Sequence, residues 1–158
     1  MATRGLERGD LAGVLALMRQ HAEFEGYAAT FFLDENALGR LGFDRPTPAY
    51  HMLVSEDAER KIQGVALFFL QEFTFRNRPM LYLNDLVIDA ACRRQGVASE
   101  LIAALREKAR ELGCFRIKWS VSAANAAAIA FYDSIGAARE KNRFYYILDE
   151  VALPAASS

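Results

Sequence analysis

The stretch 81–99, LYLNDLVIDAACRRQGVAS, constrains the fold of this chain more than any other part of its sequence. It begins with an apolar run that has the length of a central strand, formed by Leu81, Leu83, Leu86, Val87 and Ile88. A basic segment containing Gly96 follows, and the residues after this glycine have the apolar spacing of a helix. The pattern predicts a buried strand that turns directly into a helix.

The turn between this strand and the helix is predicted to bind a phosphate or pyrophosphate. Its successive backbone N–H groups lie at a helix N-terminus, which favours an anion. The small residues Gly96 and Ala98 let a ligand approach the main chain closely. The candidate anion-binding residues are Arg93, Arg94, Gln95, Gly96, Val97, Ala98 and Ser99. A solvated basic turn is the alternative interpretation of the two arginines.

Two polar side chains, Asn84 and Asp85, stand side by side within the apolar run. Neighbouring residues of a strand point to opposite faces, so each face of the sheet is expected to receive one polar group. Burying such groups costs free energy unless they find partners, which makes both residues candidates for function. A structural role for Asp85, bonding to loop backbone, is an equal alternative.

Size and charge limit the class of protein. A chain of 158 residues predicts one domain, here 1–150, followed by a short flexible tail, 151–158. The formal net charge of -1 gives no support for a nucleic-acid or membrane-surface partner. Apolar runs such as Val65–Leu70 are much shorter than the roughly 20 residues that cross a bilayer. With no signal-peptide pattern at its N-terminus, the protein is expected to be soluble and cytoplasmic.

Cysteine and histidine usage predicts neither disulfides nor a metal site. Cys92 and Cys114 form no disulfide framework and no CxxC pair. His21 and His51 are far apart in sequence and lack the spacing of metal ligands. The absence of GxxxxGK[ST] and GxGxxG motifs argues against an ATP or dinucleotide enzyme.

The remaining pattern predicts alternating helices and strands. We expect helices over 11–25, 35–41, 97–112 and 123–134, and strands over 49–55, 64–75, 81–88, 114–121 and 144–148. Leu101, Leu105 and Leu112 are expected to lie in the core. The order indicates an α/β or mixed α+β fold, in which helices cover both faces of one sheet.

Two segments of the chain resemble the signatures of the GCN5-related N-acetyltransferases (GNAT). Arg93-x-x-Gly96-x-Ala98 is similar to the signature that binds the pyrophosphate of acyl-CoA. The second signature is similar to Asn125-x-x-Ala128-x-x-Phe131-Tyr132-x-x-x-Gly136-Ala137. Within the superfamily, the stretches 22–25, 62–66, 81–85 and 129–132 resemble the diamine (spermidine/spermine) acetyltransferases. The resemblance implies a twisted mixed sheet, acetyl-CoA as co-substrate, a transferase acting on amines and a homodimer.

The resemblance also implies roles for individual residues. The backbone of Leu86, Val87 and Ile88 is expected to pair with the pantetheine arm, and residues 93–99 and Asn125 are expected to contact acetyl-CoA. The Tyr132 hydroxyl would lie near the sulfur and protonate the leaving thiolate, a step that suits a phenol protonated at neutral pH. Backbone N–H groups at the end of the strand can stabilise the oxyanion.

The chain departs from the polyamine enzymes at two places. Where those enzymes have a glutamate that serves the substrate amine, this chain has Asn84, which is no base at neutral pH. A water chain to Asp85 or to Glu25, which resembles a substrate-binding glutamate, can take the proton instead, or the amine can bind in its neutral form. Arg76, together with Arg78, suits an acceptor with a carboxylate or phosphate better than a polycation.

Three functions remain open from the sequence. The first is an N-acetyltransferase acting on a small amine, either diamine-like or amino-acid-like. The second is a catalytically weak module that senses acyl-CoA, which the asparagine at position 84 favours. The third is an acetyltransferase acting on a protein amine.

Overall fold

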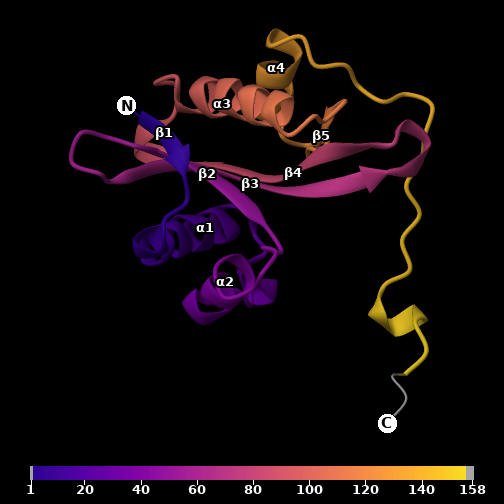
Figure 1. The fold of residues 1–158 in the computed structure, drawn as a ribbon, viewed down its shortest axis with the longest axis horizontal. Helices are drawn as coiled ribbons and strands as arrows, with labels where there is room; N and C mark the ends of the chain where they lie inside the picture. The colour runs from indigo at the N-terminus through magenta and orange to yellow at the C-terminus, as the bar shows by residue number, and fades with distance from the viewer. Residues whose placement is uncertain (1, 156–158) are drawn as a thin grey trace. The chain divides into compact units, whose positions relative to one another are not determined.

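The computed structural model describes residues 2–155. The chain divides into two compact units, and the boundary between them in the sequence lies between Ser120 and Val121. The first unit contains every strand of the described residues and three α-helices (Figure 1). Its elements are β1 (Ala2–Gly5), α1 (Leu11–Glu25), α2 (Glu35–Gly42), β2 (His51–Glu56), β3 (Ile62–Phe73), β4 (Arg78–Ile88), α3 (Val97–Glu111) and β5 (Ile117–Lys118). The second unit contains α4 (Ala126–Ser134) and a 3-10 turn (Glu150–Ala152).

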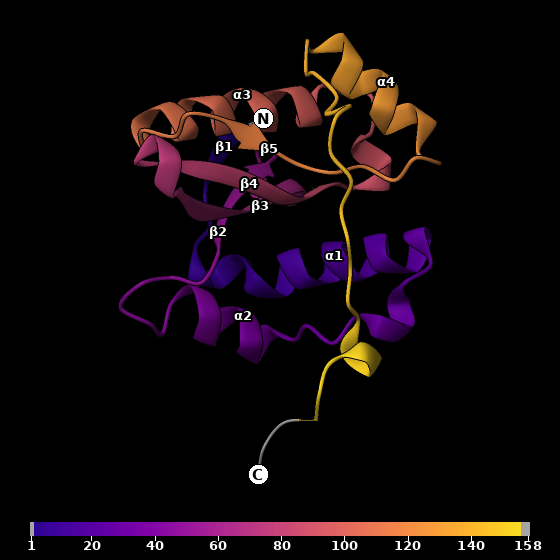
Figure 2. The same ribbon diagram turned by 90° about the vertical axis from the view of Figure 1, so that its right-hand side faces the viewer.

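The strands form one mixed sheet in the order β1-β2-β3-β4-β5. The first four strands are antiparallel to their neighbours, whereas β4 and β5 are parallel. Helix α3 covers one face, and α1 and α2 lie on the other (Figures 1 and 2). The predicted α/β architecture with helices on both faces is therefore confirmed. Strand β1 has no counterpart in the sequence-based expectation, and β5 is much shorter than the strand predicted over 114–121.

Apolar helix faces make the core on both sides of the sheet. One face of α1 packs with inward-facing residues of β2, β3 and β4; this cluster includes Leu11, Val14, Leu15, Leu17, Met18, Met52, Val54, Val65, Leu67 and Val87. On the other face, Leu101 and Leu105 of α3 are fully buried, as predicted. Leu112 is 39% exposed, so its expected place in the core is wrong. It lies just beyond the last residue of α3, where the helical periodicity no longer directs it toward the sheet.

The ends of the helices follow local sequence signals in most cases. Gly26 ends α1 in the left-handed conformation, with a φ of 83° that glycine adopts without strain. Asp34 begins α2, and its carboxylate accepts a hydrogen bond from the Ala37 N–H at 2.7 Å. Asp10 precedes α1 as expected, but its side chain does not cap that helix. It binds Arg4 instead.

The segment Phe144–Leu148, predicted to be the last strand, forms no strand. Its five side chains are 72–95% exposed: Phe144, Tyr145, Tyr146, Ile147 and Leu148. The run has the aromatic and β-branched composition of a strand, but a strand also needs a neighbouring backbone to pair with. Within residues 2–155 no strand pairs with this segment, and composition alone does not supply that partner.

Arg4 joins the start of the chain to the far end of β2. Its guanidinium donates to Asp10 Oδ2 at 2.8 Å and to Glu56 Oε2 at 2.5 Å. All three side chains are largely shielded from solvent. Hydrogen bonds from Arg4 lower the pKa of both carboxyls below their ordinary values of 3.8 and 4.5. Each ionised carboxyl of the network therefore stabilises the folded state, and its contribution is lost when it is protonated.

Replacing Arg4 by methionine is expected to lower Tm by roughly 5 °C near pH 7, because two close carboxylates lose their shared cation. In the wild type the stabilisation is present above the unfolded-state pKa values and is lost as the pH falls through the lower folded-state values. The Tm difference between wild type and variant should therefore narrow toward about pH 3, as measured by thermal melts over a pH series. Arg110→Met, which removes an exposed pair with Glu107, is the control and should change Tm little. A Tm difference independent of pH would contradict this account.

Candidate active site

The C-terminal half of β4 has an open edge on the side of β5. In the described residues β4 pairs with β5 only at Leu81–Ile117 and Tyr82–Lys118. On its other side β4 continues to pair with β3, up to Gly64–Ile88. Alternate backbone groups of the strand beyond Tyr82 therefore face the open edge without a strand partner. This edge can accept an extended, hydrogen-bonding ligand such as an amide-containing chain.

A β-bulge at Asn84 brings two polar side chains together. Leu67 pairs with Asp85 and Phe68 pairs with Leu83, so Asn84 is the extra residue of β4. The Asn84 amide Nδ2 donates to Asp85 Oδ2 at 2.8 Å. The expectation that these side chains point to opposite faces is therefore wrong, because the bulge interrupts the alternation of the strand. The pair leaves an oriented carboxylate in the part of β4 that lacks a β5 partner.

The segment after β4 forms a tight turn into α3. The Asp89 carboxylate accepts from the Ala91 N–H, and the Gln95 amide donates to the Ala91 carbonyl at 2.9 Å. Arg94 and Gly96 both have positive φ, 61° and 89°, and Gly96 is the N-cap of α3. The first intrahelical bond runs from the Glu100 N–H to the Gly96 carbonyl at 3.0 Å.

The N–H groups of the first turn of α3 have no partner within the helix, as at every α-helix N-terminus. They belong to the predicted anion-binding residues Val97, Ala98 and Ser99. No Cβ projects at Gly96, and an added Cβ there would meet no heavy atom within 4 Å, so the approach to these groups is open. The turn can therefore donate backbone hydrogen bonds to an anionic group of a ligand.

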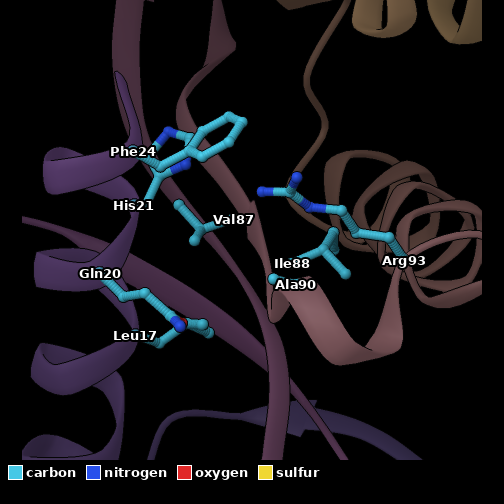
Figure 3. A pocket seen from close by; sticks show the side chains of 8 residues that line it. All are labelled: Leu17, Gln20, His21, Phe24, Val87, Ile88, Ala90 and Arg93. Atoms are coloured by element: carbon cyan, nitrogen blue, oxygen red, sulfur yellow. The ribbon is translucent and has the colours of Figure 1, made fainter. Parts of the chain in front are cut away.

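A cavity of about 90 Å³ lies between α1 and the end of β4 (Figure 3). It is lined by Leu17, Gln20, His21, Phe24, Val87, Ile88, Ala90 and Arg93. Val87, Ile88 and Arg93 were predicted site residues. The four α1 residues were not, although their spacing of three and four places them on one helix face. That spacing was the available signal, but it is also the spacing of an ordinary core-facing stripe.

Tyr27 lies next to this cavity and is influenced by two carboxylates, those of Asp85 and Glu25. Glu25 is the last residue of α1, and the Tyr27 ring contacts the His21 ring edge-on, with centroids 6.2 Å apart. Burial raises the pKa of the Tyr27 phenol, and the charges of Asp85 and Glu25 raise it further. The structure thus brings the two carboxylates that were predicted to serve the substrate amine to the same region, and adds Tyr27.

Arg76 lies at the opposite end of β4 from these groups. Its guanidinium stacks over the Phe115 ring, 5.3 Å from the centroid. A strand rises about 3.3 Å per residue, so the run from Arg78 to Asp85 spans roughly 20 Å. The structure therefore does not bring Arg76 together with Asp85 and Glu25, and the predicted substrate contact of Arg76 is not supported.

The second unit carries the two remaining predicted site residues on α4. Asn125 is the N-cap, and its side-chain oxygen accepts from the Ala128 N–H at 3.1 Å. Tyr132 lies in the last turn of the helix, with its ring centroid 5.5 Å from that of Phe131. Burial raises the pKa of the Tyr132 phenol above its ordinary value of 10.0. The phenol therefore keeps its proton at neutral pH and can act as a proton donor.

Two classes of feature are absent from the described part of the chain. No group of three or more His, Cys, Asp or Glu side chains within 2–155 is arranged to hold a metal ion. In the same range, no helix has the length and apolar content needed to span a bilayer.

Known proteins are similar to this chain in sequence and in fold. Residues 15–137 match the model of a family described as "Acetyltransferase (GNAT) family". A thialysine N-epsilon-acetyltransferase of Bos taurus is 30% identical over 141 residues, covering 85% of this chain and 82% of the relative. An L-ornithine N5-acetyltransferase of Arabidopsis thaliana is 33% identical over 76 residues, covering 48% of this chain and 33% of the relative. A solved structure described as a probable acetyltransferase superposes with a TM-score of 0.80 at 22% identity, covering 94% of this chain and 97% of that one.

Proposed function

Because this chain belongs to the acetyltransferase (GNAT) family and is an acetyl-CoA-dependent N-acetyltransferase, we propose that its acceptor is a primary amine of a small molecule, diamine-like or amino-acid-like. The observation that carries the proposal is the open edge of β4, whose C-terminal end borders both the cavity beside α1 and the turn into the N-terminus of α3. The relatives named for thialysine and ornithine acetylation support a small amine as acceptor.

The first unit supplies the groups proposed to hold acetyl-CoA. The pyrophosphate would accept hydrogen bonds from the backbone of residues 93–99, where the helix N-terminus favours an anion. The backbone of Leu86, Val87 and Ile88 would bind the pantetheine amides along the open edge of β4. This arrangement presents the thioester carbonyl to the amine and leaves backbone N–H groups to stabilise the oxyanion.

The proposed reaction is a direct attack without a covalent enzyme intermediate. The neutral amine nitrogen forms a bond to the thioester carbonyl carbon, the carbon–sulfur bond breaks, and the nitrogen loses one proton. Tyr132 donates its proton to the departing thiolate. Because burial raises the pKa of its phenol, Tyr132 is protonated and can act as this donor at neutral pH. Asp85, oriented by Asn84, is the proposed acceptor of the amine proton through water, with Glu25 as the second candidate.

Amine-dependent release of CoA from acetyl-CoA tests this function. The panel contains diamines and polyamines, amino acids with side-chain amines, aminoglycosides and short peptides, and product masses locate the acetyl group. We expect acetylation of a diamine or an amino acid. Acetylation of peptides alone would indicate a protein acceptor, and tight CoA binding with no acetylation of any amine would indicate a sensing module.

Asp85→Asn is expected to lower kcat/KM at neutral pH by about 10- to 100-fold, because a positioned base is lost. Glu25→Gln is the matched control. If Asp85 is the base, this variant should change kcat/KM by less than about threefold. Full activity in Asp85→Asn together with lost activity in Glu25→Gln would show that Glu25 accepts the amine proton. Full activity in both variants, with a rate that rises with pH as the free amine titrates, would show that the neutral amine binds directly.

Two further expectations concern the assembly of the protein and its location. We expect a homodimer, which size-exclusion chromatography with light scattering would detect. We also expect the enzyme to act in the cytoplasm, where acetyl-CoA is available.

A further inference from the structure

A second, larger cavity lies toward the β1 edge of the sheet, away from the open edge of β4. Its volume is about 330 Å³, at the lower end of the range of small-molecule sites. It is bounded by the end of β1, the start of β2, the end of α2 and the C-terminal end of α3. None of the described residues that line it belongs to α1, to β4 or to the turn before α3. The cavity is therefore separate from the groups proposed to hold acetyl-CoA.

Aromatic side chains form much of the wall of this cavity. Phe43 and Tyr50 come from the segment that joins α2 to β2, and Phe68 comes from β3. The Tyr50 hydroxyl donates to the Leu38 carbonyl at 2.9 Å, which fixes the position of its ring. The ring also stands directly against Gly42, where an added Cβ would lie 2.5 Å from the Tyr50 oxygen. The wall is thus held in place, and its rings suit an aromatic ligand.

His51 is one of two cationic or basic side chains that line the cavity. Its ring stacks on Phe68, with centroids 5.4 Å apart, and its nitrogens form no hydrogen bond among residues 2–120. Burial lowers the pKa of the imidazole, and the nearby charge of Lys108 lowers it further. The ring is therefore neutral at neutral pH, and one of its nitrogens can donate a hydrogen bond to a ligand.

Lys108 of α3 brings a positive charge to the same cavity. Its ammonium donates to Glu111 Oε2 at 2.9 Å, but the two side chains are 40% and 54% exposed. Such an exposed pair contributes little free energy, and an ammonium has three donors, so a ligand can share it. No acidic side chain of the described residues lines the cavity. Charge complementarity therefore favours an anionic ligand.

Phe68 connects the cavity with the strand that carries the candidate catalytic pair. It pairs with Leu83 of β4, and the register of β3 and β4 shifts between Leu67 and Phe68. This shift is the bulge that joins Asn84 to Asp85. A ligand that contacts the Phe68 ring from the cavity therefore acts on a residue that flanks the bulge.

We propose that this cavity is a second ligand site, which binds a small aromatic carboxylate and acts as an effector site for acetyl transfer. The carboxylate lies between the Lys108 ammonium and the His51 imidazole, and the ring of the ligand packs among Phe43, Tyr50 and Phe68. Binding itself does not depend on which amine is the acceptor. Occupancy changes the rate of transfer through Phe68 and the bulge, not through the acetyl-CoA site.

An aromatic acid and its amide test the ligand class. The chain has two histidines, His21 and His51, so the imidazole NMR signals report the two cavities separately. Titrating 3-phenylpropionate into protein saturated with CoA should shift the His51 signals and leave those of His21 unchanged. Its neutral amide, 3-phenylpropanamide, should bind about fivefold more weakly, because one ion pair is lost. No shift of His51, or equal affinities for acid and amide, would overturn the proposal.

Lys108→Met should remove the preference for the acid. The affinity for 3-phenylpropionate is expected to fall about fivefold, with little change for the amide. Arg110→Met removes the same charge from an exposed position of α3 outside the cavity, and this matched control should keep the wild-type preference. A preference that survives in Lys108→Met would show that the carboxylate does not lie beside this ammonium.

The kinetics of acetyl transfer test the effector role. Saturating 3-phenylpropionate should change kcat/KM for the acceptor by about fivefold in the wild type, and less at the same concentration in Lys108→Met. An equal change in Lys108→Met would place the effect at the active site and overturn the proposal, and binding at His51 with unchanged kcat/KM would overturn the effector role. Failure to acetylate any amine, together with the His51 shift, would overturn the proposed function and leave the ligand site standing.

Discussion

Replacing Tyr132 by phenylalanine is expected to lower kcat by about 100-fold or more while Kd for acetyl-CoA stays nearly unchanged. The substitution removes only the hydroxyl, so the ring and its packing beside Phe131 on α4 are kept. Without the phenol, the thiolate must leave unprotonated or take a proton from water. Steady-state kinetics and equilibrium binding of acetyl-CoA measure the two quantities separately.

The pH profile gives a second test of the same residue. Burial raises the pKa of the Tyr132 phenol above 10.0, so the donor form persists through the neutral and mildly alkaline range. The kcat of the wild type should therefore show no descending limb from this group below about pH 10. Tyr146→Phe is the matched control, because Tyr146 is 95% exposed, and it should retain full activity. Wild-type kcat in Tyr132→Phe would remove the proposed acid.

Replacing Gly64 by valine is expected to cost about 3 kcal/mol of the free energy of unfolding, because β3 and α3 approach each other closely at this glycine. A Cβ there would lie 2.8 Å from Val97 Cγ1, 2.9 Å from Ile88 Cδ1 and 3.1 Å from Leu101 Cδ1. These side chains are packed between the sheet and the helix, so they cannot move away without shifting α3. Denaturant unfolding of the variant measures the loss.

The same substitution is expected to weaken acetyl-CoA binding. Val97 is the first residue of α3, and displacing it moves the N–H groups proposed to bind the pyrophosphate. Gly64→Ala, with a single added methyl group, should show both effects in smaller measure. The control is Gly13→Ala in α1, where the nearest atom to a new Cβ is Ile62 Cγ1 at 3.6 Å. It should be neutral or stabilising by about 0.5 kcal/mol, since alanine favours a helix interior. Unchanged stability in Gly64→Val would contradict the close packing.

Local signals in the sequence were sufficient to predict where several helices begin or end. A glycine that needs positive φ ended α1 at Gly26, and a side-chain cap began α2 at Asp34. Asn125 and the glycine turn before Val97 likewise marked the starts of α4 and α3. These boundaries depend on the chemistry of one or two residues and their own backbone, so they can be read without knowledge of distant contacts.

Strands, which need a partner strand far away in the sequence, could not be predicted from such local signals. The short strand β1 lacks an apolar alternation, and it exists because its backbone pairs with β2 from Ala2–Glu56 to Gly5–Leu53. Conversely, Phe144–Leu148 has the composition of a strand and forms none. Backbone pairing between strands joins residues far apart in sequence, so composition is a weak guide to it.

By itself, the sequence determined the fold class, the family signatures and most of the proposed acetyl-CoA-binding residues, because each depends on a local pattern of apolar, small and capping residues. Only the tertiary structure decided how those residues combine. The bulge opposite Leu67 and Phe68 turned Asn84 and Asp85 into a hydrogen-bonded pair. The packing of α1 against β4 directed Arg93 to Phe24, whereas the length of β4 kept Arg76 away. Side-chain direction depends on which backbones lie next to each other, and that arrangement is set by the packing of the whole sheet.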